Sequence, residues 1–356
     1  MNTYDVPVFK KTGFDNALYK RLQTEEILKR VSKISSGHLY LEIGGKLFND
    51  PHAARVLPGF DPKIKIDILK SLNTPSDIIF CMNYADILSN RQLNNHKENY
   101  IDSSLNILND LQTTFGVTPY ICINNIKFEE EKKQEFMTAV KYIYSRNPNI
   151  SFRYYIEGYP DNTEKILSPE GFGKDSLIPV QNKLVIVTGS ASNSGKLSTC
   201  LGMVYKDAVL GLNSDYAKYE TFPIWNLPLE HPVNLAYEAA TADIGDRNVI
   251  DTYYQQAYGK TAVNYNRDVQ AFSVVKKLME SEYQSPTDMG ISNAGFAITD
   301  DEVVCIAALE EIKRRKRWYK EMDNKQTAWS KACEELETDA MKYIKEKGYN
   351  PNLQLI

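Results

Sequence analysis

The sequence predicts an α/β protein with a mainly parallel, doubly wound sheet that contains a phosphate-loop-like strand-turn-helix, followed by a helical C-terminal region. Short β-branched and aromatic runs alternate with longer stretches of 3.6-residue periodicity. This alternation implies right-handed crossovers, with helices covering both faces of the sheet. Because such sheets bind ligands at the carboxyl ends of their strands, we expect a functional site at that edge.

Strand and helix signals alternate up to residue 188. The runs typical of strands are 38–43, 77–82, 119–124, 150–156 and 184–188. The periodicity predicts helices at 16–33, 98–115 and 128–146. Glu129, Glu130 and Glu131 are expected in the first turn of the last helix, where the helix dipole favours negative charge.

The pattern changes after residue 188. Helices are expected at about 196–209 and 233–242, and short strands at 261–264 and 295–299 flank another helix. Two charged helices follow, one from about 301 and one at about 326–347. We therefore expect a Rossmann-like α/β region at 1–180, a phosphate-loop-like α/β region at 181–300 on the same or an adjacent sheet, and a helical region at 301–356. The basic run 313–317 is interpreted as a solvated face because acidic residues surround it.

Composition excludes several classes of protein. The 42 Lys and Arg residues are balanced by 46 Asp and Glu, so the chain has no basic field for nonspecific nucleic-acid binding. No apolar stretch approaches the roughly 20 residues that a membrane span needs, and the N-terminus has no secretory signal, which predicts a cytoplasmic protein. The five cysteines form no C-x-x-C pair and the four histidines have no ligand spacing, which disfavours a zinc site.

The strongest local motif is the segment 184–200, in which an apolar strand leads through small residues to a Gly-Lys pair at a helix start. Small residues let backbone N–H groups converge on phosphate oxygens, and the helix N-terminus and a lysine add positive charge. The predicted ligand-binding residues here are Gly189, Ser192, Asn193, Ser194, Gly195, Lys196, Ser198 and Thr199. The alternative is a Ser/Gly-rich turn with a solvent-facing lysine.

The spacing of this motif departs from the standard G-x-x-x-x-G-K-[ST] pattern. Gly189 precedes Gly195 by six positions rather than five, and Leu197 replaces the hydroxyl residue that normally follows the lysine. Binding of a magnesium ion would therefore require Ser198 or Thr199 to reach the ion from a shifted turn. Phosphate binding is consequently better supported than metal-assisted phosphotransfer.

Two further glycine turns have a similar character. Gly44, Gly45 and Lys46 follow the first predicted strand, and they should lie on the same sheet edge as the motif above. They are predicted to meet a second anionic group, with a turn that needs positive φ as the alternative. The segment 168–174 has the same small-plus-lysine composition and the same two interpretations.

Polar residues interleaved with aromatic ones follow the motif. Arg267 is predicted to pair with a phosphate or carboxylate, although Asn266 or Asp268 would equally well form a helix N-cap. Lys218 and Glu220 would share one face of a strand, where an ion pair between them is an equally good interpretation.

Several long strings resemble the uncharacterised bacterial family called domain of unknown function family 1846, also uncharacterised protein family 0371. They lie at 13–15, 39–48, 52–60, 194–201, 216–228, 231–243, 264–268 and 285–290. The resemblance covers most of residues 13 to about 320. It implies no particular reaction. Because members of the family usually continue into a further small α/β subdomain, it implies a C-terminally shortened member.

Two functional hypotheses follow from the site residues. In the first, the chain is an ATP-dependent phosphotransferase or ligase that acts on a small metabolite with ATP, or another nucleotide, and magnesium. Lys196 would hold phosphate, while Arg267 with Asp268 or Glu220 would orient the acceptor. In the second, the chain is a non-catalytic module that senses a nucleotide or phosphometabolite. Both hypotheses predict a phosphorylated small-molecule ligand and neither nucleic acid nor membrane as a partner. Formation of a homo-oligomer is left open.

Overall fold

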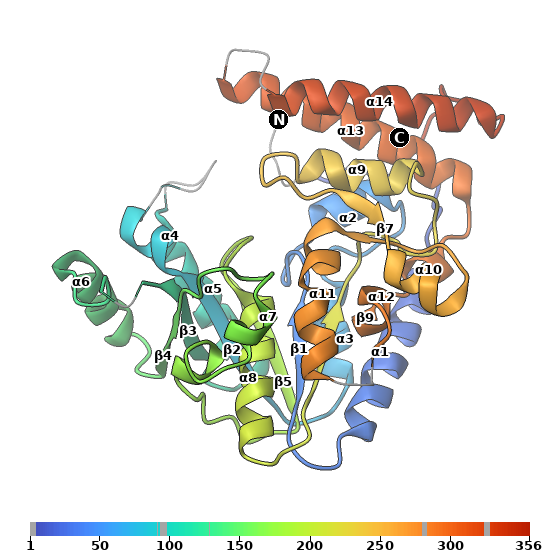
Figure 1. Ribbon diagram of the computed structural model, residues 1–356. Helices are drawn as coiled ribbons and strands as arrows, with labels where there is room; N and C mark the ends of the chain where they lie inside the picture. The colour runs from blue at the N-terminus through green and yellow to red at the C-terminus, as the bar shows by residue number, and fades with distance from the viewer. Residues whose placement is uncertain (1–4, 91, 93–97, 128, 280–282, 324–327) are drawn as a thin grey trace.

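One seven-stranded parallel sheet organises the molecule (Figure 1). The computed structural model describes residues 5–90, 92, 98–127, 129–279, 283–323 and 328–356. The strand order is β4-β3-β2-β5-β1-β6-β9, and a separate antiparallel pair is formed by β7 and β8. The strands are β1 (Leu39–Ile43), β2 (Ser76–Asn83), β3 (Tyr120–Ile126), β4 (Ile150–Tyr154), β5 (Leu184–Gly189), β6 (Asp215–Tyr219), β7 (Asn248–Ile250), β8 (Val263–Tyr265) and β9 (Gly290–Ile291).

The predicted parallel α/β sheet is confirmed, and its strand order answers a question that the sequence left open. The strand β5 lies between β2 and β1, so strands from the regions 1–180 and 181–300 belong to the same sheet. In β1, Leu39, Leu41 and Ile43 belong to one apolar cluster while Tyr40 belongs to the other. Both faces of the sheet are therefore buried, as expected when helices cover each side.

The helices pack on both faces of the sheet and beyond its carboxyl edge. They are α1 (Asn16–Lys33), α2 (Pro51–Val56), α3 (Ile64–Ser71), α4 (Tyr84–Ser89), α5 (Tyr100–Phe115), α6 (Gln134–Tyr144), α7 (Thr163–Ile166), α8 (Lys196–Val209), α9 (Pro232–Ala240), α10 (Thr252–Tyr258), α11 (Asn266–Leu278), α12 (Pro286–Met289), α13 (Asp301–Asp323) and α14 (Ala328–Glu346). Short 3₁₀ turns cover Phe172–Lys174 and Ala294–Ala297. The predicted bounds of α1 and α8 are confirmed.

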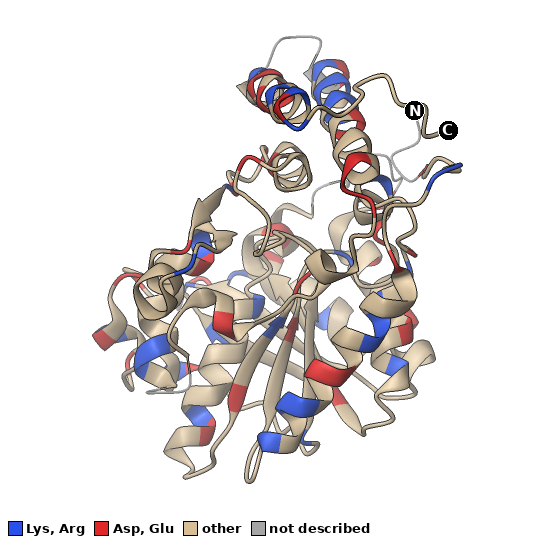
Figure 2. Ribbon diagram, turned by 90° about the vertical axis from the view of Figure 1, so that its right-hand side faces the viewer, with Lys and Arg blue, Asp and Glu red and all other residues tan. Residues whose placement is uncertain are grey.

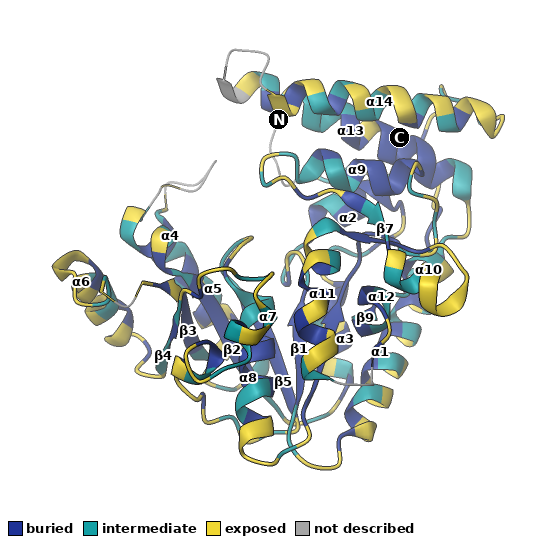
Figure 3. Ribbon diagram, in the orientation of Figure 1, coloured by how far each residue is buried: buried dark blue, intermediate teal, exposed yellow. Residues whose placement is uncertain are grey.

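The C-terminal helices α13 and α14 stack on α9 and α2, beyond the carboxyl ends of the strands (Figure 1). The first half of α13 is buried in this stack, whereas its other end and α14 carry more exposed positions (Figure 3). Both basic and acidic residues occur along the outer helices (Figure 2). The expected helical C-terminal region is therefore confirmed. Within the described ranges, no helix is both long and apolar enough to cross a membrane.

Two local predictions are wrong. The helix expected at 128–146 begins only at Gln134, so Glu129, Glu130 and Glu131 precede it in turns, held in part by a hydrogen bond from Lys133 N to Glu130 O (3.1 Å). Residue 128 lies outside the described residues. The segment 295–299 was expected to be a strand, but Ala294–Ala297 form a 3₁₀ turn, in which the backbone at Gly295 packs against Asn226.

Candidate anion-binding site

Three turns meet at the carboxyl edge of the sheet. β1 pairs with both β5 and β6, so the residues that follow these strands are neighbours. The turn 44–46 follows β1, the β5–α8 loop (residues 190–195) follows β5, and Thr221 lies just beyond β6. Together they line a cavity of about 290 Å³, to which the β5–α8 loop contributes Ser192. The structure thus brings the two predicted glycine turns to one cavity.

Side chains from neighbouring strands hold the carbonyl groups of the β5–α8 loop. The amide of Asn83, at the end of β2, donates to Asn193 O (3.0 Å), and the amide of Asn124 on β3 donates to Ser194 O (2.9 Å). Asn193 and Gly195 have φ values of 60° and 88°. Among the described residues, the backbone N–H groups of 191–198 donate to no protein acceptor. A run of unpaired N–H groups at a helix start is the arrangement that binds anions.

Lys196 is the first residue of α8, and its side chain is half-buried. It makes no hydrogen bond or ion pair with any residue that the structure describes. The hydroxyls predicted for magnesium donate to protein acceptors. Ser198 Oγ donates to Gly195 O (3.1 Å), and Oγ1 of the fully buried Thr199 donates to Asn124 Oδ1 (3.0 Å). A metal-binding role for Ser198 or Thr199 stays a prediction.

Arg267 is committed to other protein groups. Its Nε lies 2.6 Å from Asp246 Oδ1, and its guanidinium also donates to the side chain of Asn193 in the β5–α8 loop. Arg267, which lies on α11, therefore links this loop to Asp246. The predicted N-cap by Asn266 or Asp268 is wrong, because Asn266 is already the first residue of α11.

Lys218, Glu220 and Asp268 form a buried cluster. The predicted ion pair is confirmed, since Lys218 Nζ lies 2.6 Å from Glu220 Oε1, and Asp268 also binds this ammonium group. Burial raises the pKa of Glu220 to about 8, although the charge of Lys218 opposes the shift. A Cβ added to Gly44 would lie 3.6 Å from Glu220 Cγ. Glu220 therefore packs beside Gly44, which lines the cavity, without lining the cavity itself.

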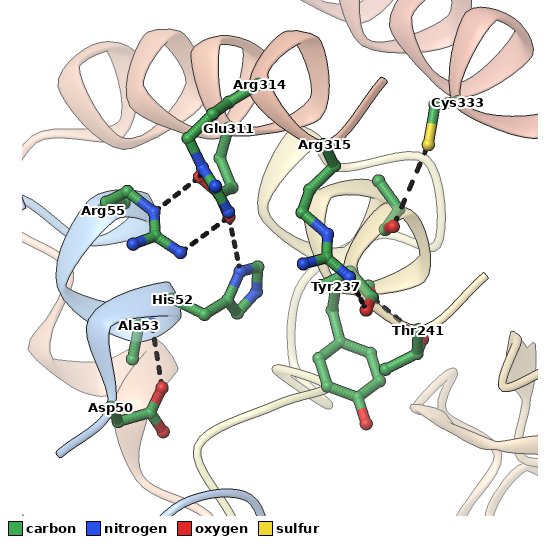
Figure 4. A network of polar contacts seen from close by, with 12 residues as sticks. Asp50, His52, Ala53, Arg55, Tyr237, Thr241, Glu311, Arg314, Arg315 and Cys333 are labelled. Atoms are coloured by element: carbon green, nitrogen blue, oxygen red, sulfur yellow. Dashed lines mark hydrogen bonds and ion pairs between the residues drawn. The ribbon is translucent and has the colours of Figure 1, made fainter. Parts of the chain in front are cut away.

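The sequence analysis missed most of the cavity's cationic residues. The cationic pocket, as we call this cavity, is lined by the side chains of Lys46, His52, Arg55, Lys65, Arg314 and Arg315. Within it Asp50 pairs with Lys65 (3.0 Å). Arg55 Nε lies 2.7 Å from Glu311 Oε2, and Arg314 Nε lies 2.6 Å from the same oxygen (Figure 4). The prediction that the run 313–317 is a solvated face is wrong for Arg314 and Arg315, because α13 packs against α2 and α9.

A second group of chemically active side chains lies between α9 and α13. Ligand atoms of His231, Asp301 and Cys305 all lie within 4.8 Å of one another, although the spacing of the histidines predicted no such group. His231 Nδ1 accepts the N–H of Val233, so Nε2 carries the proton and donates to Asp301 (3.0 Å). The three groups therefore have protein partners, and His231 also caps α9 through Nδ1.

Comparisons with known proteins agree with the resemblance in the motifs. The model of the family described as "Domain of unknown function DUF1846, N-terminal" matches residues 12–347. A UPF0371 protein of Corynebacterium efficiens is 43% identical over 310 residues, which cover 86% of this chain and 62% of the relative. A UPF0371 protein of Streptococcus pneumoniae serotype 2 is 43% identical over 312 residues, with the same coverage. The chain thus spans about three fifths of the length of these relatives, and it belongs to the DUF1846 family.

Proposed function

We propose that this chain binds the phosphate groups of a nucleotide at the β5–α8 loop and transfers a phosphoryl or nucleotidyl group to a small metabolite. One observation carries the proposal: among the described residues, the N–H groups of 191–198 have no protein acceptor, and the ammonium group of Lys196 beside them has no protein partner. Residues 192 and 193 are exposed, but residues 194–198 are buried or half-buried, and such donors without acceptors are uncommon in folded proteins. A bound phosphate would supply acceptors for both sets of donors.

Glu220 supplies the acid–base chemistry in this proposal. Its raised pKa, about 8, makes its carboxylate a stronger base than an exposed one. The carboxylate takes the proton of the acceptor hydroxyl while the hydroxyl oxygen bonds to the phosphorus and the bond to the leaving phosphate oxygen breaks. Lys218 holds Glu220 in place and is itself paired with Asp268. A magnesium ion at Ser198 or Thr199 stays a prediction, and no step is assigned to it.

The second candidate is a sensing module that binds the nucleotide without turnover. The commitment of the Thr199 hydroxyl to Asn124 favours it, because a magnesium-assisted phosphate loop needs such a hydroxyl at its metal. The two candidates differ in a single measurement. Release of phosphate or diphosphate from a bound nucleotide supports the enzyme, and binding without release supports the sensor.

The variant Lys196→Ala tests the binding site. We expect it to weaken the binding of ATP or GTP by about 10- to 100-fold, which corresponds to the roughly 1.5–3 kcal/mol of one charge-assisted hydrogen bond. Lys63→Ala, an exposed lysine at the start of α3, is the matched control. Calorimetric titration measures both variants. Unchanged affinity in Lys196→Ala, or equal losses in the two variants, would remove the proposed site.

A further inference from the structure

Three side chains that are able to bind a metal ion converge where α9 meets α13. Asp301 and Cys305 lie one turn apart at the start of α13, so their side chains share one face of that helix. His231 caps the start of α9, which packs against α13 (Figure 1). One ligand atom from each residue, a nitrogen, an oxygen and a sulfur, lies within 4.8 Å of the other two. We call these three residues the His-Asp-Cys group.

The distances within the His-Asp-Cys group are close to those of a tetrahedral metal centre. His231 Nε2 lies 3.0 Å from Asp301 Oδ1 and 3.5 Å from Cys305 Sγ. The same sulfur lies 3.9 Å from Asp301 Oδ2. Zinc bonds of about 2.05 Å to nitrogen, about 2.1 Å to oxygen and about 2.3 Å to sulfur place these pairs of atoms about 3.4, 3.6 and 3.6 Å apart at tetrahedral angles. Each observed distance is within about 0.4 Å of its tetrahedral value, so small side-chain rotations are enough to form the site.

The surroundings hold the three side chains in place and leave one side open to solvent. His231 and Cys305 are buried, with exposed fractions of 1% and 0%. The ring of Tyr343 packs edge-on against the imidazole at 5.1 Å, and the hydroxyl of Tyr349 donates to Asp301 Oδ2 (2.8 Å). Such outer contacts orient metal ligands. The Asp301 side chain is 36% exposed, which leaves a position for water as the fourth ligand.

Metal binding requires a rearrangement of protons in the group. His231 carries its proton on Nε2, because Nδ1 accepts the N–H of Val233. Burial raises the pKa of the Cys305 thiol, which is therefore protonated in the metal-free chain. When a divalent ion binds, the thiol proton leaves to solvent and the imidazole proton moves from Nε2 to Nδ1, where it displaces the Val233 N–H from its acceptor. The exchange gives up one helix-capping hydrogen bond and forms three metal–ligand bonds, so it favours the bound ion.

We propose that His231, Asp301 and Cys305 bind one divalent transition-metal ion, for which Zn²⁺ is the best match, and that this ion links the start of α9 to the start of α13. An imidazole, a thiolate and a carboxylate suit zinc, whereas magnesium and calcium take oxygen ligands. The ion would stabilise the stack of C-terminal helices on α9. The inference goes beyond the proposed function and does not depend on it, because none of the three residues belongs to the β5–α8 loop.

A titration of the full chain with Co²⁺, after removal of metal ions with a chelator, tests this inference. Co²⁺ replaces zinc in tetrahedral sites, and it gives a near-ultraviolet absorption band when a thiolate binds it. We expect a band that saturates at one Co²⁺ per chain and that disappears when Zn²⁺ is added. Cys305→Ala should abolish the band, and Asp301→Asn should weaken Co²⁺ binding at least about tenfold. Asp301→Asn is expected to keep the fold, because Asp301 is partly exposed and the amide oxygen still accepts the hydrogen bond from His231.

Cys333→Ala is the matched control. Cys333 is also a buried thiol in the stack of C-terminal helices, but its sulfur donates to Ala239 O (3.9 Å) and lies outside the His-Asp-Cys group. This variant should keep the absorption band. Zn²⁺ should raise the unfolding temperature of the parent chain and of Cys333→Ala, but not that of Asp301→Asn. The inference is overturned if the parent chain gives no thiolate band, if Cys305→Ala keeps the band, or if Cys333→Ala loses it to the same extent.

Discussion

Replacing Glu311 by Gln should have opposite effects on stability and on anion binding. The Glu311 side chain is 1% exposed, and it is paired with Arg55 at 2.7 Å, Arg314 at 2.6 Å and His52 at 3.1 Å. The amide keeps the shape of the carboxylate and removes its charge. Two arginines at the wall of the cationic pocket then lose their counter-charge, which raises the positive charge of the pocket by one unit.

Removing one partner of a buried ion pair typically costs about 3–5 kcal/mol, because the remaining charge stays buried without compensation. We expect Glu311→Gln to lower the free energy of unfolding by about 3 kcal/mol, since the Gln oxygen still accepts a hydrogen bond from one arginine. The affinity of the cationic pocket for inorganic phosphate or succinate should rise, because the pocket becomes more positive. Urea unfolding with linear extrapolation measures the first effect and calorimetric titration the second.

The pH dependence gives a further check on Glu311. Burial alone would raise the pKa of Glu311, but hydrogen bonds and charges from Arg314, His52 and Arg55 hold it well below its usual value of 4.5. Because the pKa is lower in the folded state than in the unfolded one, the stabilisation is complete above pH about 4.5 and is lost as the pH falls through the folded-state value. The difference in stability between the parent chain and Glu311→Gln should therefore shrink below pH about 4.

A neighbouring residue provides the control for this experiment. Glu310 lies on the same helix and pairs with Lys313 at 2.8 Å, but its side chain is 57% exposed. Glu310→Gln removes the same charge at the surface and should change the stability by less than about 0.5 kcal/mol. If Glu311→Gln is as stable as Glu310→Gln, or if it binds the anions more weakly than the parent chain, the electrostatic account of the pocket is wrong.

Two other predictions concern the β5–α8 loop and the proposed base. Gly195→Ala should lower the unfolding temperature and abolish nucleotide binding, because Gly195 has a φ of 88° and its new Cβ would lie 2.7 Å from Asn124 Cβ. Gly211→Ala is the control. Gly211 has a φ of 77° and lies in open space, so this variant measures the cost of the backbone conformation alone. Phosphate release should increase as the pH rises through about 8, where Glu220 loses its proton. If the variant Glu220→Gln shows the same pH profile, Glu220 is not the base.

The elements that depend on local sequence were the easiest to predict. The helix α1 begins and ends at the predicted residues because Asp15 caps it, accepting a hydrogen bond from Leu18 N, and its apolar positions repeat along one face. The meeting of the β5–α8 loop with the turn 44–46 was also predictable, since parallel strands place their carboxyl ends at one edge. In both cases a short stretch of chain contains the information that determines the structure.

The cationic pocket could not be predicted in this way. His52 and Arg55 come from α2, whereas Arg314 and Arg315 come from α13, and no local pattern shows that these helices pack together. The acidic neighbours of the run 313–317 suggested a solvated surface, but Glu311 is itself buried and serves as the partner of Arg55 and Arg314. Which face of a charged helix is buried depends on the elements that pack against it. A sequence without an alignment does not contain that information.

The departure of the phosphate-loop motif from the standard spacing has a physical consequence at the site. Thr199, which the spacing left as a possible metal ligand, donates its hydroxyl to Asn124, and Asn124 in turn holds the carbonyl of Ser194. The Thr199 hydroxyl thus helps to fix the conformation of the β5–α8 loop through Asn124. Lys196, at the start of α8, is placed to neutralise part of the charge of a bound phosphate. Because fixed cations on an open edge are screened by salt, nucleotide affinity should fall steeply as ionic strength rises.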